Sequence, residues 1–143
     1  MAENRNITWN VALVIKSDIS SPFSFYLKDA KLEWGKWRVN PPSDVIASEA
    51  GKTYKFQFIA EGTSCTAEGT EGKVIYESDD NSSEPTTIEF YFDVPFTKAN
   101  KGNVYITGGA SNGNYSINNG GGVPKTGNEP VIEVSITQVK PVV

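Results

Sequence analysis

Apolar and polar residues alternate in short runs along most of the chain. In six segments every second residue is apolar, and most of these residues are β-branched or aromatic. The segments are ITWNVALVI, FSFYL, TYKFQFIA, KVIYES, TTIEFYFDV and VIEVSITQV. Side chains two positions apart lie on the same face of a strand, so each segment predicts a strand with one buried face. The aromatic residues predicted to fill the core are Trp9, Phe23, Phe25, Phe56, Phe58, Phe90 and Phe92.

Turn-forming clusters separate these segments. They include SSP, NPPSD, AGK, EGT, SDDNSSEP and NNGGGVPKTGNEP. No capped apolar stretch of helical length interrupts them. Many short strands joined by Gly- and Pro-rich turns predict an all-β fold, an antiparallel β-sandwich of two sheets. We expect one domain over residues 1–143, with residues 107–129 forming loop except for a short strand through NYSIN.

The segment LEWGKW places Trp34 and Trp37 three positions apart. In a regular strand such positions face opposite sides of the sheet, so one indole is predicted in the core and the other in water. A bend at Gly35 would change that relation. An exposed tryptophan on a small protein is the first indication of a binding surface.

Composition excludes several kinds of partner. The chain has 13 basic and 17 acidic residues, a formal net charge of −4, and no basic run. Nucleic acid is therefore not an expected partner, because phosphate binding needs clustered Lys and Arg. Attraction to anionic membranes is not expected for the same reason.

Targeting signals and disulfides are not expected either. Cys65 is the only cysteine, so no intrachain disulfide is predicted. The first residues, MAENRNITWN, lack the layout of a signal peptide, and no apolar run is long enough for a membrane helix. We expect a protein made soluble in the cytoplasm and released.

Catalytic and metal chemistry also find little support. GASNG matches the G-x-S-x-G pattern around Ser111, but the chain has no histidine to act as base. The same absence, with one cysteine, excludes the usual zinc sets. ESDDNSSE could hold calcium, but it is better interpreted as a solvated hairpin turn. We expect no enzyme, no cofactor and no metal site.

Three blocks resemble the aegerolysin family. LEWGKW resembles its WGK segment, TAEGTEGKVIYES its central AEGT stretch, and IEFYFDVPFTKANKGNVYITG its FYWD-x-PW block. They occur in the family's order and cover most of the chain from Lys31 to Gly108. GKWR-NP and YFD-PF are also similar to the small component of bacterial binary insecticidal toxins, which belongs to the same group. The chain departs from the family block at Phe92 and Phe96, where tryptophan is common, and at Val94, where cysteine is common.

The resemblance implies a β-sandwich that binds membrane sphingolipids of the target cell. It further implies haemolytic or insecticidal pore formation only with a larger second toxin component, in the fungal systems one with a perforin-like fold. The small component would act at the target-cell membrane surface as a monomer or weak homodimer.

The resemblance also singles out lipid-binding residues. Trp34 matches the family tryptophan at the lipid-contacting end, although a half-buried position against Leu32 is the alternative. Trp37 either extends that patch or fills the core. Lys36 is a candidate for pairing with a lipid phosphate, if it is not simply solvated. Glu68 matches the glutamate of AEGT near the headgroup, where an ordinary turn residue would also fit.

Two further candidates come from the aromatic block. Adjacent residues of a strand face opposite sides of the sheet, so Tyr91 is predicted to point away from Phe90 and Phe92 and toward the surface. Phe96 follows Pro95 and is predicted to leave the strand, where its ring could reach lipid. Two other classes of function remain open: a lectin-like carbohydrate-binding module, for which aromatics and Asn-rich loops are also suited, and a purely structural subunit.

Overall fold

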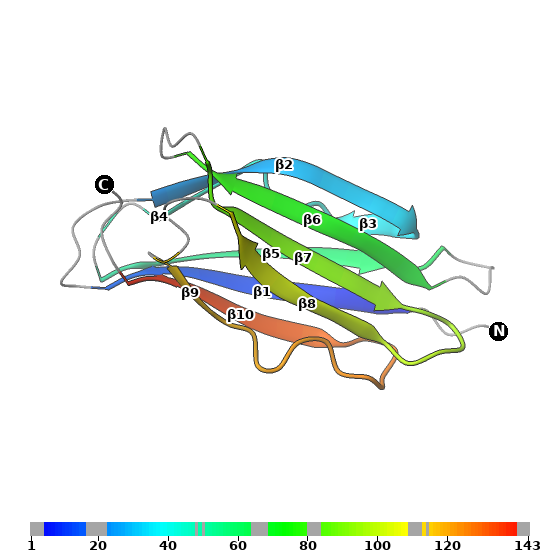
Figure 1. Ribbon diagram of the computed structural model, residues 1–143. Coiled ribbons are helices and arrows are strands. Elements are labelled where there is room, and N and C mark those ends of the chain that lie inside the picture. Colours follow the sequence, from blue (N-terminus) through cyan, green and yellow to red (C-terminus); the bar gives the residue numbers. More distant parts are fainter. Residues whose placement is uncertain are drawn as a thin grey trace.

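The described part of the chain forms ten strands in two five-stranded sheets that pack face to face (Figure 1). The computed structural model describes residues 5–16, 23–47, 49, 51–63, 69–79, 84–108, 113 and 115–139, and these contain no α-helix. The strands are β1 Asn6–Ile15, β2 Phe23–Trp34, β3 Lys36–Val39, β4 Asp44–Ala47, β5 Thr53–Glu61, β6 Thr70–Ser78, β7 Thr87–Val94, β8 Lys101–Thr107, β9 Tyr115–Asn118 and β10 Val131–Gln138. The predicted two-sheet sandwich is confirmed.

The first sheet has the order β3-β5-β1-β10-β9. Its central strand β1 pairs antiparallel with β5 but parallel with β10, with Thr8 opposite Val131 and Ile15 opposite Gln138. This parallel pair differs from the purely antiparallel arrangement expected. The reason is the Gly- and Asn-rich segment after β9, which runs back along the sandwich so that β10 enters at the same end as β1 (Figure 1).

The second sheet has the order β4-β2-β6-β7-β8, and all its pairs are antiparallel. β6 and β7 pair on either side of the SDDNSSEP segment, as a hairpin requires. β2 is the longest strand, with 12 residues. It meets β4 near its start and β6 along most of its length, so its last residues reach one end of the sandwich.

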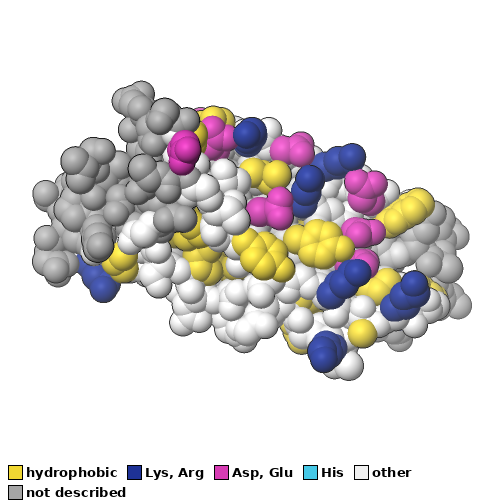
Figure 2. Space-filling model, in the orientation of Figure 1, with side chains coloured by type: hydrophobic (Ala, Val, Ile, Leu, Met, Phe, Trp, Pro, Cys, Tyr) yellow, Lys and Arg dark blue, Asp and Glu magenta, His cyan; other side chains and the backbone are white. Residues whose placement is uncertain are grey.

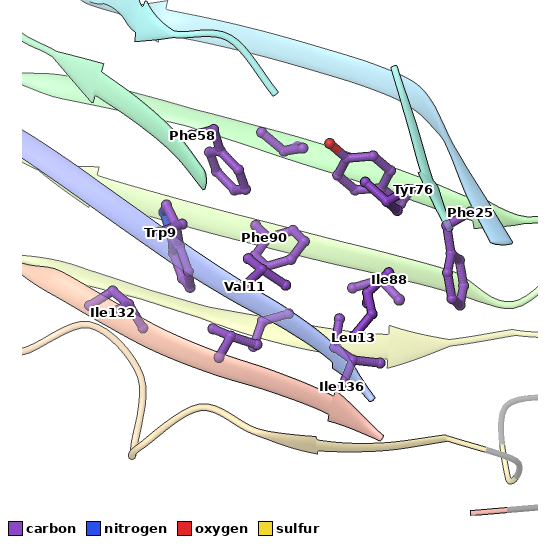
Figure 3. Packing of buried hydrophobic residues seen from close by; sticks show 14 of the residues in the cluster. Trp9, Val11, Leu13, Phe25, Phe58, Tyr76, Ile88, Phe90, Ile132 and Ile136 are labelled. Atoms are coloured by element: carbon purple, nitrogen blue, oxygen red, sulfur yellow. The ribbon is translucent and has the colours of Figure 1, made fainter. Parts of the chain in front are cut away.

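The core lies between the sheets, where the alternating segments place it. The fully or almost fully buried side chains include Ile7, Trp9, Val11, Leu13, Ile15, Phe25, Phe58, Ile88, Phe90, Phe92, Val94, Ile132, Val134 and Ile136. Rings from both sheets meet edge to face: the Phe90 centroid lies 5.3 Å from that of Trp9 and 5.2 Å from that of Phe58 (Figure 3). Such contacts add to the free energy of apolar burial.

Phe56 was predicted in the core but is only partly buried. β3 pairs with β5 only from Ile59 to Glu61, so over its first half β5 is the edge of the sheet. At this open edge Tyr54, on the same parity, is 38% exposed. The side chain of Phe23 lies outside the described part of the structure.

Candidate functional site

Gly35 transfers the chain from one sheet to the other. β2 ends at Trp34 in the second sheet, and β3 begins at Lys36 in the first. The φ angle of Gly35 is 99°, which favours glycine, and a Cβ there would collide with the Glu61 carbonyl oxygen and the Thr70 hydroxyl. A single residue thus redirects the strand between the two tryptophans.

The two indoles have different surroundings. Trp34 is 53% exposed, while Trp37 turns inward. The Trp37 ring lies edge-on to those of Phe58 and Phe92, with both centroid distances at 6.1 Å. The expectation of one indole in water is confirmed for Trp34, whereas Trp37 is only partly buried and packs against the core. Trp37 does not extend the exposed patch.

A groove of about 300 Å³ lies at the end of the sandwich where β2 and β7 end and β6 begins. Its lining residues are Trp34, Gly69, Thr70, Glu71, Asp93, Pro95, Phe96, Thr97 and Lys98. The Thr70 hydroxyl donates to the Trp34 carbonyl oxygen at 3.2 Å and so joins β6 to the end of β2. Basic and acidic side chains gather with apolar ones over this half of the second sheet's outer face (Figure 2).

Two carboxylates face each other across the floor of the groove. Glu71 on β6 lies directly opposite Asp93 on β7, and Glu71 is also in register with Trp34. Burial, and then the charge of Glu71, raise the pKa of Asp93 above its usual value. Like charges directly opposite destabilise a sheet, and the nearby charges of Lys101 and Lys98 partly offset the effect by lowering the pKa of Asp93.

Tyr91 holds one of these carboxylates in place. Its hydroxyl donates to Glu71 Oε2 at 3.0 Å. Burial and this hydrogen bond to Glu71 raise the pKa of Tyr91 to about 12, so the phenol keeps its proton at physiological pH. As predicted, Tyr91 lies on the outward face of β7, but it is half-buried and acts here through Glu71.

Phe96 lies on the wall of the groove, beyond the end of β7 at Val94. Its departure from the strand after Pro95 is therefore confirmed. The Arg5 guanidinium stacks 4.8 Å from the ring centroid and donates to the Phe96 carbonyl oxygen at 3.3 Å. These contacts hold the half-buried ring at the groove.

Lys36 lies outside the groove. Its Nζ is 3.6 Å from Glu61, which also accepts a hydrogen bond from Arg38 Nε at 2.8 Å. Glu68, like Cys65 and Ser111, falls outside the described residues.

The structure thus brings Trp34 and Phe96 together and adds three charged residues that the sequence did not single out: Glu71, Asp93 and Lys98. Lys98 directly follows the YFDVPFT stretch, and parity places Asp93 on the outward face with Tyr91. Lys98 and Asp93 could therefore have been singled out from the sequence. The pairing of Asp93 with Glu71 depends on the register of β6 and β7, which the sequence does not show.

Within the described ranges, no three His, Cys, Asp or Glu side chains gather as a metal ion would need. Nor does the part of the chain described here contain a helix with the length and apolarity of a membrane span.

The family model described as Aegerolysin matches residues 10–139. The chain belongs to the aegerolysin family. No curated protein matches this aegerolysin significantly.

Solved structures share its fold at low sequence identity. IP-1A from Alcaligenes faecalis has a TM-score of 0.59 and 17% identity, over 92% of this chain and 90% of that one. RahU protein, crystallised in complex with a TRIS molecule, has a TM-score of 0.54 and 20% identity, over 91% and 92%. The lipid binding protein Nakanori has a TM-score of 0.52 and 17% identity, over 91% of this chain and 69% of that one.

Proposed function

We propose that this aegerolysin binds a membrane lipid through the groove, and that the lipid is a sphingolipid with a zwitterionic headgroup. The observation that carries the proposal is the combination in one groove of an exposed tryptophan, a second aromatic ring, a pair of facing carboxylates and a lysine. Family membership supports lipid binding in general, as does the lipid-binding relative Nakanori.

The headgroup's ammonium would occupy the space between Glu71 and Asp93. A cation there relieves the repulsion between the two carboxylates, and the neighbouring Trp34 ring offers a favourable face to it. Lys98, which also lines the groove and whose charge acts on Asp93, would then meet the phosphate. Both signs of charge are therefore available within one groove, as a zwitterion requires.

Trp34 and Phe96 would enter the interfacial layer of the membrane. Aromatic rings favour this layer because their faces are apolar while the indole N–H stays hydrated. With a formal net charge of −4, the protein has no general attraction to anionic bilayers, so recognition depends on the headgroup and on ring insertion.

Membrane rupture would then require a second, larger toxin component. A membrane-crossing β-strand needs about 9–11 residues. The candidates β1 and β7 both fill the core, and releasing either would remove buried residues such as Trp9 or Phe90. The proposed role is that of the lipid-docking partner of a binary, insecticidal pore-forming toxin, acting at the surface of the target cell.

Sedimentation with vesicles that differ only in one lipid tests the proposal. The series contains sphingomyelin, ceramide phosphoethanolamine, ceramide without a phosphate headgroup, or phosphatidylserine in a phosphatidylcholine background. We expect binding to one or both zwitterionic sphingolipids and loss of that binding in Trp34→Ala. Equal binding across the series, or binding to phosphatidylserine alone, would contradict the proposal.

A further inference from the structure

The outer face of the first sheet carries a trough of about 900 Å³, larger than the groove. It crosses β5, β1 and β10 and reaches the end of β9. None of its lining residues lines the groove, which lies on the end of the other sheet. The trough is therefore a separate place on the molecule.

Small side chains make the trough hollow. Ala12 on β1 lies directly opposite Ser135 on β10, and the same cross-strand row continues to Lys55 on one side and Asn118 on the other. Neighbouring strands are about 4.8 Å apart, so two short side chains between two long ones leave a depression roughly two strands wide.

A hydrogen-bonded ladder of polar side chains borders this depression. Gln57 Nε2 donates to Asn10 Oδ1 at 2.8 Å, and Asn10 Nδ2 donates to Glu133 Oε1 at 3.0 Å. The three residues lie in one row across β5, β1 and β10. Their mutual bonds fix the orientation of both amides, so a ligand would meet side chains that are already ordered.

The ladder has hydrogen-bonding capacity left over. An amide side chain has two N–H donors and a carbonyl oxygen with two lone pairs, and a carboxylate has two oxygens. After the two ladder bonds, one amide hydrogen and the carbonyl oxygen of Gln57, and one oxygen of Glu133, remain available for other partners. Donors and acceptors thus alternate along an exposed row, a pattern that matches hydroxyl groups, which both donate and accept.

Charge and polarity narrow the class of ligand. Among the described residues that line the trough, Lys55 and Glu133 alone are charged, and their charges cancel. A phosphate-rich ligand would need more cations, and an apolar ligand would leave the amide groups desolvated without partners. The trough volume lies in the range of small-ligand sites.

We propose that this trough is a second binding site, which takes a short neutral oligosaccharide. Its hydroxyl groups would bond to Gln57, Asn10 and Glu133, and one ring would lie over Ala12 and Ser135. The site is independent of the groove, so the protein could hold a glycan while its aromatic end contacts lipid.

Calorimetric titration of the full chain with lactose, maltotriose, chitobiose and mannotriose tests the proposal for soluble sugars. Sedimentation with phosphatidylcholine vesicles carrying lactosylceramide tests the same chemistry on a lipid. We expect millimolar or tighter binding to at least one of these probes. Loss of the ladder bonds in Gln57→Ala, or filling of the hollow in Ala12→Leu, should weaken it about tenfold or more.

Matched variants make the result decisive. Thr137→Ala changes the same outer face of β10 beyond the trough, and Trp34→Ala changes only the groove; both should bind the sugar like the wild type. Thermal unfolding of each variant separates lost binding from lost fold, and Gln57 is exposed enough to be truncated safely. Absence of binding to every probe, or sugar binding that Gln57→Ala and Ala12→Leu leave unchanged, would overturn the proposal.

Discussion

Truncation of Trp34 to alanine separates a lipid-inserting ring from a structural one. The side chain is 53% exposed at the end of β2, beside the groove. A tryptophan can bury up to about 250 Å², so roughly 130 Å² is free to leave water when the protein docks. At about 25 cal/mol per Å² this area contributes about 3 kcal/mol, and each 1.4 kcal/mol is about tenfold in affinity.

The expected result is therefore lipid binding about a hundredfold weaker. The expected loss of stability is about 1 kcal/mol or less, because most of the ring is already in water. Trp9, which is fully buried between the sheets, provides the contrast: Trp9→Ala should cost about 3–5 kcal/mol.

Ile46 provides the matched control. It is 51% exposed, almost as much as Trp34, but lies on β4, which pairs with the first residues of β2 at the opposite end of the sandwich (Figure 1). Ile46→Ala should leave binding unchanged. Vesicle titration at fixed lipid composition, together with thermal unfolding, measures both quantities for all three variants.

Two outcomes would refute this reasoning. If Trp34→Ala unfolds at a temperature as low as Trp9→Ala, the ring is structural. If Trp34→Ala and Ile46→Ala weaken binding equally, the groove end has no special part in docking.

Four further predictions concern the charged groups and the membrane. Binding to sphingolipid vesicles should persist at about 1 M salt, where the screening length is about 3 Å, because charge pairs at contact distance in a partly buried groove are screened little; a steep decline would indicate long-range attraction to a charged bilayer instead. Because the pKa of Asp93 is raised, the folded state binds this proton more tightly than the unfolded state, and the contribution of Asp93 to stability increases as pH falls through the raised value. Asp93→Asn should therefore raise the melting temperature at neutral pH but not in acid, and vesicle binding should decline on acidification in the wild type more than in the variant. Glu68→Ala should change the set of sphingolipids bound more than it changes stability. An unaltered lipid profile would disprove a role for Glu68 in lipid binding. The purified chain should release no dye from vesicles that it binds, and leakage near the binding concentration would contradict a two-component mechanism.

The strands predicted well from sequence are those buried along their whole length on one face. β1 and β7 alternate without interruption because every second residue meets the other sheet. β4 has only four residues, too few to show a period, and β8 begins with turn-like residues in KGNVYIT. Neither of these edge strands was predicted.

The site was predictable only in part. Parity required one of Trp34 and Trp37 to face outward, but which one depends on the change of sheet at Gly35. The facing carboxylates were harder to predict from the sequence, because Glu71 and Asp93 are far apart along the chain and meet only through the register of a hairpin. Cross-strand neighbours of this kind are fixed by three-dimensional pairing and leave no local pattern.

Because β1 and β10 run parallel, the start of β1 and the end of β10 lie at opposite ends of the sandwich, which is useful for labelling. β1 begins beside the groove, and the last residues of β10 lie at the other end of the sandwich (Figure 1). A fluorescent protein or surface tether attached after β10 would therefore project away from a docked bilayer, whereas the same attachment before β1 would stand next to Phe96 and its Arg5 contact. Immobilisation through the β10 side leaves the aromatic end free to meet vesicles, and immobilisation through the β1 side should block it.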